Sequence, residues 1–255
     1  MSALVVDARM VAETIAKLRE ARPRVHCITN AAAVNFTANV LLSAGAVPSM
    51  TVNPEEVPDF VAGADALLVN LGTLDPLRVA AIDAAVDMVR ETGRPWALDP
   101  VFVERSALRL ALAKRLVDTE PTVIRSNRAE LAALTASEGT DTDADAFALE
   151  SLSTVVRTGD TDYLTDGARS LTVTGGHPTM ALVTATGCAA TALLAGFLSV
   201  EPDAVIAAAV CLAFVAAAAE RAGRQASGPG SFVPSFIDAL HTLTPDEIGA
   251  AARIS

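Results

Sequence analysis

Short apolar runs alternate with longer stretches of helical periodicity along most of this 255-residue chain. The first helical stretch, which ends before Pro23, carries apolar residues at Met10, Val11, Ile15 and Leu18. Further helices are predicted at residues 35–42 and 76–90, where Gly45 and Gly93 supply the C-terminal caps. Each apolar run suits one buried strand, and the runs cover residues 25–29, 46–50, 66–72, 96–100, 122–125 and 154–159.

This alternation predicts an α/β fold in which helices cover both faces of a mostly parallel sheet. The pattern changes late in the chain, where residues 163–165 and 170–174 flank an Asp166-Gly167 turn typical of an antiparallel hairpin. No internal repeat or linker divides the chain. We therefore expect a single domain, residues 1–255, built as a three-layer α/β/α sandwich with a mostly parallel central sheet and an antiparallel hairpin.

Two further segments need their own interpretation. Residues 204–219 are almost wholly apolar, but the run is shorter than a membrane span and is bounded by Asp203 and Glu220. A buried core helix is the better interpretation. Residues 137–145 are rich in Ser, Thr, Asp and Glu, and we expect them to form a solvated loop.

Polar residues stand where the predicted strands end: Asn30, Asn70, Asp99, Arg125 and Thr158. The carboxyl ends of parallel strands meet at one edge of a sheet, and ligands of open α/β sheets bind outside that edge. One polar strand end is expected by chance, but a polar group at five ends of an apolar interior predicts a ligand site.

The segment 183–197 passes from a Thr-containing run through small residues into an Ala/Leu-rich helix. Free backbone N–H groups at residues 185–188, together with the positive end of the helix dipole, would bind an anion such as phosphate. Cys188 falls in the first turn, where a thiol loses its proton more easily than in water. An ordinary turn with a buried cysteine explains this segment about equally well. Since the sequence contains neither GxxxxGK[ST] nor GxGxxG, phosphate chemistry depends on this turn.

Two carboxylates accompany the predicted phosphate site. Asp99 ends a strand before Pro100, and Glu130 lies about one helical turn beyond Arg125. Few carboxylates, several waters and phosphate oxygens suit Mg²⁺. The structural alternatives are a strand-end turn for Asp99 and a charge at a helix start for Glu130. Arg125 is a candidate for bidentate phosphate binding, with a surface ion pair as its alternative.

Composition narrows the class of protein. The formal charge is −11 and aromatic residues make up only 4%, which argues against a nucleic-acid surface. The three cysteines lack metal-site spacing, and residues 1–9 lack the apolar segment of a signal peptide, so we expect a reduced, cytoplasmic setting. Core positions are expected for Cys27 and Cys211, and hydrogen-bonded structural roles for His26 and His177.

Taken together, these segments resemble the hydroxyethylthiazole kinase family, ribokinase-like enzymes of thiamine salvage. The resemblance extends over nearly the whole chain and keeps the family's order. Any one run is weak evidence, but the combination is specific. The matching runs are residues 25–30, 35–39, 70–74, 98–101, 122–125 with Asn127 and Glu130, 162–167, 176–178, 186–188 and 226–230.

The resemblance implies transfer of the γ-phosphoryl group of ATP to the hydroxyl of 4-methyl-5-(2-hydroxyethyl)thiazole, with Mg²⁺. It also implies a homotrimer with active sites between subunits. Carried over to this chain, Cys188 lies at the substrate hydroxyl, and Asp99 and Glu130 hold Mg²⁺ directly or through water. The implied ATP contacts are Arg125, Thr158, Thr186 and Gly187. The implied thiazole contacts are Asn30, Met50 and Ala185.

The chain departs from the family pattern near the predicted site. Ala185 replaces a usual Gly, and we expect the anion hole to survive because Ala is small. Residues 102–105 replace a Gly-containing loop, which predicts a stiffer connection. Two rival functions remain: a nucleotide-dependent nicotinamide-nucleotide hydrate dehydratase, disfavoured by the match over residues 25–50, and a catalytically weak binding protein for thiazole or nucleotide. ATP consumption that depends on the thiazole alcohol discriminates between all three.

Overall fold

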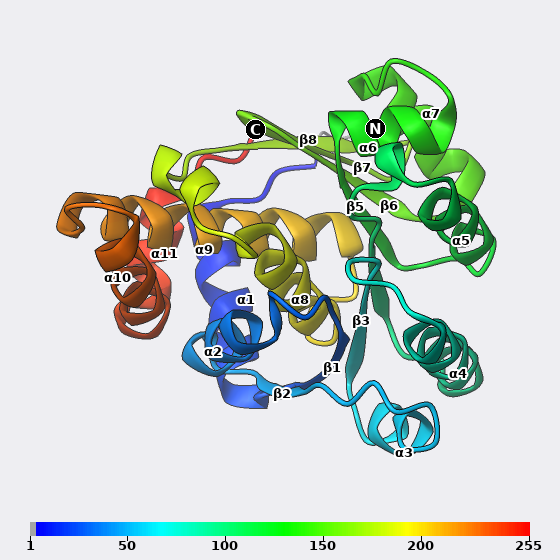
Figure 1. Cartoon of the computed structure of the whole chain (residues 1–255). Helices are drawn as coiled ribbons and strands as arrows, with labels where there is room; N and C mark the ends of the chain where they lie inside the picture. The colour runs from blue at the N-terminus through cyan, green and yellow to red at the C-terminus, as the bar shows by residue number, and fades with distance from the viewer. Residues whose placement is uncertain (1–3) are drawn as a thin grey trace.

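Eight strands form one sheet in the computed structural model, which describes residues 4–255 (Figure 1). The strand order is β2-β1-β3-β4-β5-β6-β7-β8. The pairs from β2 to β6 are parallel, as predicted, and β7 and β8 pair antiparallel. The strands are β1 (Arg24–Ile28), β2 (Val47–Ser49), β3 (Ala66–Asn70), β4 (Trp96–Asp99), β5 (Val123–Asn127), β6 (Thr154–Thr158), β7 (Thr161–Thr165) and β8 (Ser170–Thr174).

Helices cover both faces of the sheet, which confirms the three-layer sandwich (Figure 1). One layer contains α3 (Val57–Ala62), α4 (Pro76–Thr92), α5 (Ala107–Val117), α6 (Arg128–Thr135) and α7 (Asp141–Ser151). The other contains α1 (Ala8–Ala21), α2 (Val34–Ala44), α8 (Thr186–Leu198), α9 (Ala204–Gln225), α10 (Pro229–Thr242) and α11 (Pro245–Ala251). The short 3₁₀ helices are η1 (Val103–Arg105) and η2 (Pro178–Leu182).

The central strand β3 shows why the strands are apolar along their whole length. Successive side chains of a strand point to opposite faces of the sheet. Ala66 and Leu68 pack into the core beside α8 and α9, while Leu67 and Val69 pack into the core beside α4. All five residues of β3 are buried. A strand covered on both faces therefore carries a continuous apolar run instead of an alternating one.

The predicted helix ends and the hairpin are confirmed. Gly45 and Gly93 follow α2 and α4 with φ of 111° and 65°, the left-handed conformation of a glycine C-cap. The turn between β7 and β8 is closed by the Asp166 side chain, which accepts hydrogen bonds from the backbone N–H groups of Ala168 and Arg169. Because β7 also pairs antiparallel with β6, β7 runs against the parallel strands and β8 runs with them, and the hairpin extends the sheet at this edge.

The prediction of a solvated loop over residues 137–145 is wrong for its second half, where α7 begins. Thr140 caps this helix, and its side chain accepts from the N–H of Asp143 while the Asp143 carboxylate accepts from the N–H of Thr140. The polar residues that suggest a loop thus form a capping box. Behind them, Ala144 and Phe147 are buried against the sheet layer.

The long apolar segment forms α9, a core helix as predicted. Among residues 4–255, α9 is the one helix with the length and composition of a membrane span, yet 72% of its most apolar window is buried inside the chain. The Asp203 side chain caps its start by accepting from the N–H groups of Val205 and Ile206. Phe214 packs edge-on against Phe197 of α8, with ring centroids 6.4 Å apart. Burial of α9 in turn fixes the position of α8.

Candidate active site

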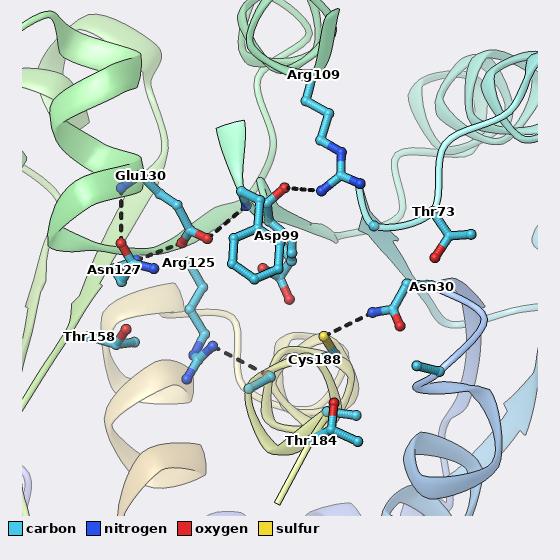
Figure 2. A pocket seen from close by; sticks show the side chains of 16 residues that line it. Asn30, Thr73, Asp99, Arg109, Arg125, Asn127, Glu130, Thr158, Thr184 and Cys188 are labelled. Atoms are coloured by element: carbon cyan, nitrogen blue, oxygen red, sulfur yellow. Dashed lines mark hydrogen bonds between the residues drawn. The ribbon is translucent and has the colours of Figure 1, made fainter. Parts of the chain in front are cut away.

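A cavity of about 460 Å³ opens where the carboxyl ends of the parallel strands meet the start of α8 (Figure 2). The position agrees with the edge that the polar strand ends predict. The residues that line it are Asn30, Ala32, Gly72, Thr73, Asp99, Val101, Phe102, Arg109, Arg125, Asn127, Glu130, Thr158, Thr184, Ala185, Gly187 and Cys188.

Most of the residues predicted for the site line this one cavity. They are Asn30, Asp99, Arg125, Glu130, Thr158, Ala185, Gly187 and Cys188. Thr186 instead lines an adjoining cavity of about 720 Å³, which shares Arg125, Thr158 and Gly187 with the first. Met50 lines neither cavity and packs, partly buried, against the core beside α8 and α9.

The turn that leads into α8 has the backbone of a glycine turn although its residue is alanine. Ala185 takes φ of 70° and ψ of 3°, a left-handed conformation that costs a residue with a Cβ about 1–2 kcal/mol. The backbone N–H groups of residues 186–188 find no acceptor within residues 4–255. The start of α8 therefore offers free donors and the positive end of a helix dipole to the cavity.

The sulfur of Cys188 is held by two amides from neighbouring strand ends. The Nδ2 groups of Asn30 and Asn70 lie 3.2 and 3.3 Å from Sγ. The same Nδ2 of Asn70 donates to Oδ2 of Asp99 at 2.8 Å. Asn30 follows β1, and Asn70 and Asp99 end β3 and β4, so the strand order of the sheet sets the position of the thiol. Figure 2 shows Asn30 and Asp99 beside Cys188.

The prediction that Cys188 ionises easily is wrong. Burial raises the pKa of its thiol to about 11, and the nearby Asp99 carboxylate adds to this rise. Hydrogen bonds from Asn30 and Asn70 and the charge of Arg125 lower the pKa by less. The position in the first turn of α8 is as predicted, but desolvation is the largest influence on the pKa of this thiol. At neutral pH the group is a thiol that can orient a partner, not a thiolate base.

Asp99 is a buried carboxylate with one oxygen committed to the protein. Its Oδ2 accepts from Asn70 and, at 3.1 Å, from the Thr191 hydroxyl. Burial raises the pKa of Asp99, opposed first by the charge of Arg125 and then by these two hydrogen bonds. Its Oδ1 accepts no hydrogen bond from the described part of the chain, so this oxygen is available to a ligand.

Glu130 joins α6 to the loop after β4. Its Oε2 accepts from the N–H of Asn127 at 2.9 Å and completes the capping box of α6, while its Oε1 accepts from the N–H of Phe102 at 3.0 Å. Burial raises the pKa of Glu130, and these two backbone hydrogen bonds oppose the rise. The structural role considered for Glu130 is therefore real, and its carboxylate also faces the cavity.

The carboxylates suit a cation that takes most of its ligands from elsewhere. No group of three or more His, Cys, Asp or Glu side chains that could hold a metal occurs among residues 4–255. The available Oδ1 of Asp99 and the remaining lone pairs of Glu130 match Mg²⁺, which uses one or two carboxylates with water and phosphate oxygens. Both groups lie on the same cavity as the free N–H groups of α8.

Arg125 stands at the junction of the two cavities. One of its terminal nitrogens donates to the carbonyl of Gly187 at 3.3 Å and to the Thr191 hydroxyl at 3.4 Å. Its buried Nε has no partner among residues 4–255. A buried donor without an acceptor costs free energy, which an anionic ligand at this junction would recover.

Gly72 permits the close approach that positions Asn30. A Cβ at position 72 would lie 2.5 Å from Cβ of Asn30 and 3.0 Å from Oδ1 of Asn70. The N–H of Gly72 donates to the same Oδ1 of Asn70 at 3.0 Å. The amides that hold Cys188 thus depend on a residue without a side chain.

Several residues that line the cavity, among them Thr73 and Arg109, were given no role from the sequence. Thr73 follows Gly72 in a left-handed conformation with φ of 53°. Arg109 comes from the first turn of α5 and reaches the cavity across the 101–106 connection (Figure 2). Neither residue ends a strand, so the signal that found the other residues could not find them.

The structure agrees with the structural roles expected for Cys27, Cys211, His26 and His177. Cys27 and Cys211 are fully buried. His26 is buried between the Ser49 hydroxyl at 2.8 Å and the Thr51 carbonyl at 3.1 Å, and burial lowers its pKa to about 4. His177 accepts from the N–H of Thr179 at the start of η2.

Similarity to known proteins covers almost the whole chain. The model of the hydroxyethylthiazole kinase family matches residues 15–246. A probable hydroxyethylthiazole kinase of Agrobacterium fabrum is 41% identical over 249 residues, 97% of this chain and 95% of that protein. A hydroxyethylthiazole kinase of Cereibacter sphaeroides is 42% identical over 250 residues, 93% of this chain and 95% of that protein.

Solved structures agree with the fold. The hydroxyethylthiazole kinase protein of Pyrococcus horikoshii OT3 superposes with a TM-score of 0.93 at 33% identity, covering 97% of this chain and 98% of that one. A ribokinase-like superfamily protein of Enterococcus faecalis superposes with a TM-score of 0.69 at 14% identity, covering 94% and 98% of the two chains. At that identity the likeness concerns the fold alone, which is ribokinase-like as expected.

Proposed function

This chain belongs to the hydroxyethylthiazole kinase family, and we propose that its cavity transfers the γ-phosphoryl group of ATP to the primary hydroxyl of 4-methyl-5-(2-hydroxyethyl)thiazole. One observation carries the proposal. Cys188, Asp99 with its available oxygen, and the residues Gly187 and Cys188 with their free N–H groups line a single cavity. An alcohol, a cation and a phosphoryl group each find a matching group there.

The alcohol lies beside Cys188 in this mechanism. The protonated thiol and the amide of Asn30 hold the substrate hydroxyl in line with the γ-phosphorus atom. Phosphoryl transfer passes through a loose transition state, so the hydroxyl does not need full deprotonation before attack. As the new O–P bond forms, the bond between the γ-phosphorus and the β–γ bridging oxygen breaks and ADP leaves with that oxygen. The hydroxyl proton passes to an oxygen of the transferred phosphoryl group. Positioning, more than base catalysis, is the contribution of Cys188.

The nucleotide lies across the two cavities. Arg125 at their junction, with Thr158, contacts the phosphate chain, and the larger cavity takes the nucleoside. The γ-phosphoryl group then reaches the first turn of α8, where the N–H groups of Thr186, Gly187 and Cys188 neutralise its developing charge. Donors fixed in place before the reaction stabilise a transition state without reorganisation.

Mg²⁺ is the cation that the carboxylates suit. Asp99 would hold it through Oδ1, and Glu130 through water, because both oxygens of Glu130 already accept backbone hydrogen bonds. When bound, Mg²⁺ neutralises charge on the phosphates during transfer. Burial raises the pKa of both carboxyl groups, and a cation beside them would favour their charged forms.

Met50 supports the expected homotrimer with sites between subunits. Its side chain lies outside the cavities of its own chain, just beyond β2 at the edge of the sheet. A neighbouring copy that brings Met50 to the thiazole end of the cavity reconciles this position with the expected thiazole contact. Ala185 and Asn30 complete that end from within the chain. The cytoplasm, where ATP and the thiazole alcohol meet, is the proposed location.

The direct test is ATP turnover by the purified chain with Mg²⁺, with and without hydroxyethylthiazole, with the products identified by mass. We expect ADP and the thiazole phosphate to form together, and only when the alcohol is present. The matched control uses the same thiazole without its hydroxyl, which should give no ADP above background.

Two results would contradict the proposal. ATP hydrolysis that is coupled to dehydration of a hydrated nicotinamide nucleotide would support the rival dehydratase. Tight binding of thiazole and ATP without turnover would instead leave a binding protein, and the 102–105 loop, which departs from the family pattern, would be the first place to look for the defect.

A further inference from the structure

One positively charged side chain that lines the smaller cavity, Arg109, has no role in the proposed mechanism. The charged side chains that line this cavity are Asp99, Glu130, Arg109 and Arg125. The carboxylates face the proposed cation, and Arg125 faces the phosphate chain from the junction of the cavities. ATP brings further negative charge into the same space. Arg109 is therefore a second cation placed where an anion reacts.

Arg109 enters from the side of the cavity opposite α8 (Figure 2). One terminal nitrogen donates to the carbonyl of Val101 at 3.1 Å. Its backbone N–H donates to the Ser106 side chain, the cap of α5, at 3.3 Å. No ion pair to Arg109 forms within residues 4–255, so the other donors of the guanidinium remain for a ligand.

Arg105 provides the contrast in the same segment. Its Nε is paired with the Glu104 carboxylate at 3.2 Å, and its side chain lies outside this cavity. An arginine that only stabilises the surface is expected to look like Arg105. Arg109 instead is anchored at one nitrogen and lines this cavity as well as a neighbouring surface pocket that it shares with Arg105.

We propose that Arg109 is a phosphate-binding residue that contacts the γ-phosphoryl group during transfer, on the side opposite the N–H groups of α8. The inference rests on the proposed function. A phosphoryl group in transfer spreads its charge over three oxygens, so donors on one side leave part of that charge exposed. The fork of a guanidinium matches two phosphate oxygens at once. Its anchor on Val101 fixes the orientation in advance.

Arg109→Gln tests the proposal, because glutamine keeps the start of the aliphatic stem and one polar donor but carries no charge and no fork. We expect kcat for thiazole phosphorylation to fall about a hundredfold or more, the loss typical of a transition-state donor. We also expect loss of the preference for a non-hydrolysable ATP analogue over ADP in calorimetry. Arg105→Gln, the matched control, should keep both. Circular dichroism and Tm check the fold.

A kcat of Arg109→Gln within threefold of the wild type, with an unchanged preference for triphosphate, overturns the proposal. If that variant fails to fold, Arg109→Lys decides, since it keeps the charge without the fork: a loss of about tenfold or more in kcat supports phosphate binding, and full activity overturns it. A wild type without thiazole kinase activity contradicts the proposed function instead, and the calorimetry then judges the Arg109 contact alone.

Discussion

Single side chains set the chemistry of this cavity through their burial. The Cys188 thiol sits in a helix turn that ordinarily favours ionisation, yet desolvation keeps it protonated, with a pKa of about 11. Asp99 is buried too, and its pKa is raised for the same reason. The side-chain amide of Asn70 donates a hydrogen bond to each of these two groups.

These pKa values predict the pH dependence of kcat. The raised pKa of Cys188 keeps the thiol neutral, so kcat should be flat between about pH 7 and 9. The raised pKa of Asp99 means that in the free enzyme its carboxylate protonates at a higher pH than an ordinary aspartate, so kcat/KM should fall with acid sooner than usual. A kcat that rises near about pH 8.5 in the wild type and not in Cys188→Ser would show thiolate catalysis instead.

Cys188→Ala should separate positioning from binding. Removing the thiol leaves the α8 donors and Arg125 in place, so ATP affinity should change less than about twofold while kcat falls about tenfold to a hundredfold. Isothermal calorimetry and steady-state kinetics measure the two quantities. Equal losses in affinity and kcat would refute the assignment of Cys188 to the alcohol.

Gly72→Ala should disturb the amides that hold Cys188. The new Cβ would stand 2.5 Å from Cβ of Asn30, so Asn30 must move away from the sulfur. We expect KM for the thiazole to rise about tenfold, the loss of one well-made polar contact. At Gly63 a Cβ would meet its nearest neighbour at an ordinary 3.6 Å, so Gly63→Ala is the control and should leave KM unchanged.

At the scale of elements, the connection from β4 through η1 to α6 organises the far wall of the cavity. Phe102 takes the left-handed conformation with φ of 57°, and its N–H donates to Glu130. Glu130 also caps α6. One carboxylate therefore joins a strained turn to a helix start, and the resulting wall also includes Val101, which anchors Arg109.

Glu130→Ala should cost both stability and activity. It removes a capping-box partner and the acceptor of Phe102, which should lower the free energy of unfolding by about 1–2 kcal/mol, together with most of kcat. Glu247 forms the equivalent capping box with Thr244 in α11, away from the cavity. Glu247→Ala should lower Tm in thermal unfolding and the midpoint concentration in urea unfolding, but it should leave kcat unchanged. If Glu247→Ala also lost kcat, lowered stability alone would explain the effect at Glu130.

At the scale of the molecule, the sheet brings distant segments to one edge. Asn70, Asp99 and Thr158 end β3, β4 and β6, Asn30 follows β1, and Arg125 lies inside β5, which extends to Asn127 instead of ending at the predicted residue 125. Packing of α8 in the core beside α9 holds the start of α8 above this edge. The chain is 26.2 kDa, so the proposed homotrimer should scatter light as about three times this mass. A monomeric mass with full activity would contradict a site that needs Met50 of a partner.

Much of the fold could be predicted from local patterns of apolar residues and glycines in the sequence. Strand runs such as 66–72 were clear because both faces of β3 are buried, and the glycine caps at 45 and 93 marked helix ends by their required backbone conformation. The first half of α7 was missed because Thr140 and Asp143 serve a cap with the same residue types that make loops. That the chain forms one domain stays a prediction.

The sequence alone determined which residues could meet, since polar groups at parallel strand ends share one edge of the sheet. Only the tertiary structure decided what these groups can do. Burial of Cys188 depends on packing between strand ends and α8, so its raised pKa has no local signal. Arg109 reaches the cavity because α5 packs beside the 101–106 connection, a contact between segments that periodicity does not encode. Local sequence patterns determine where helices and strands form. The desolvation of a side chain, and the close approach of side chains from distant segments, depend on how the whole chain packs.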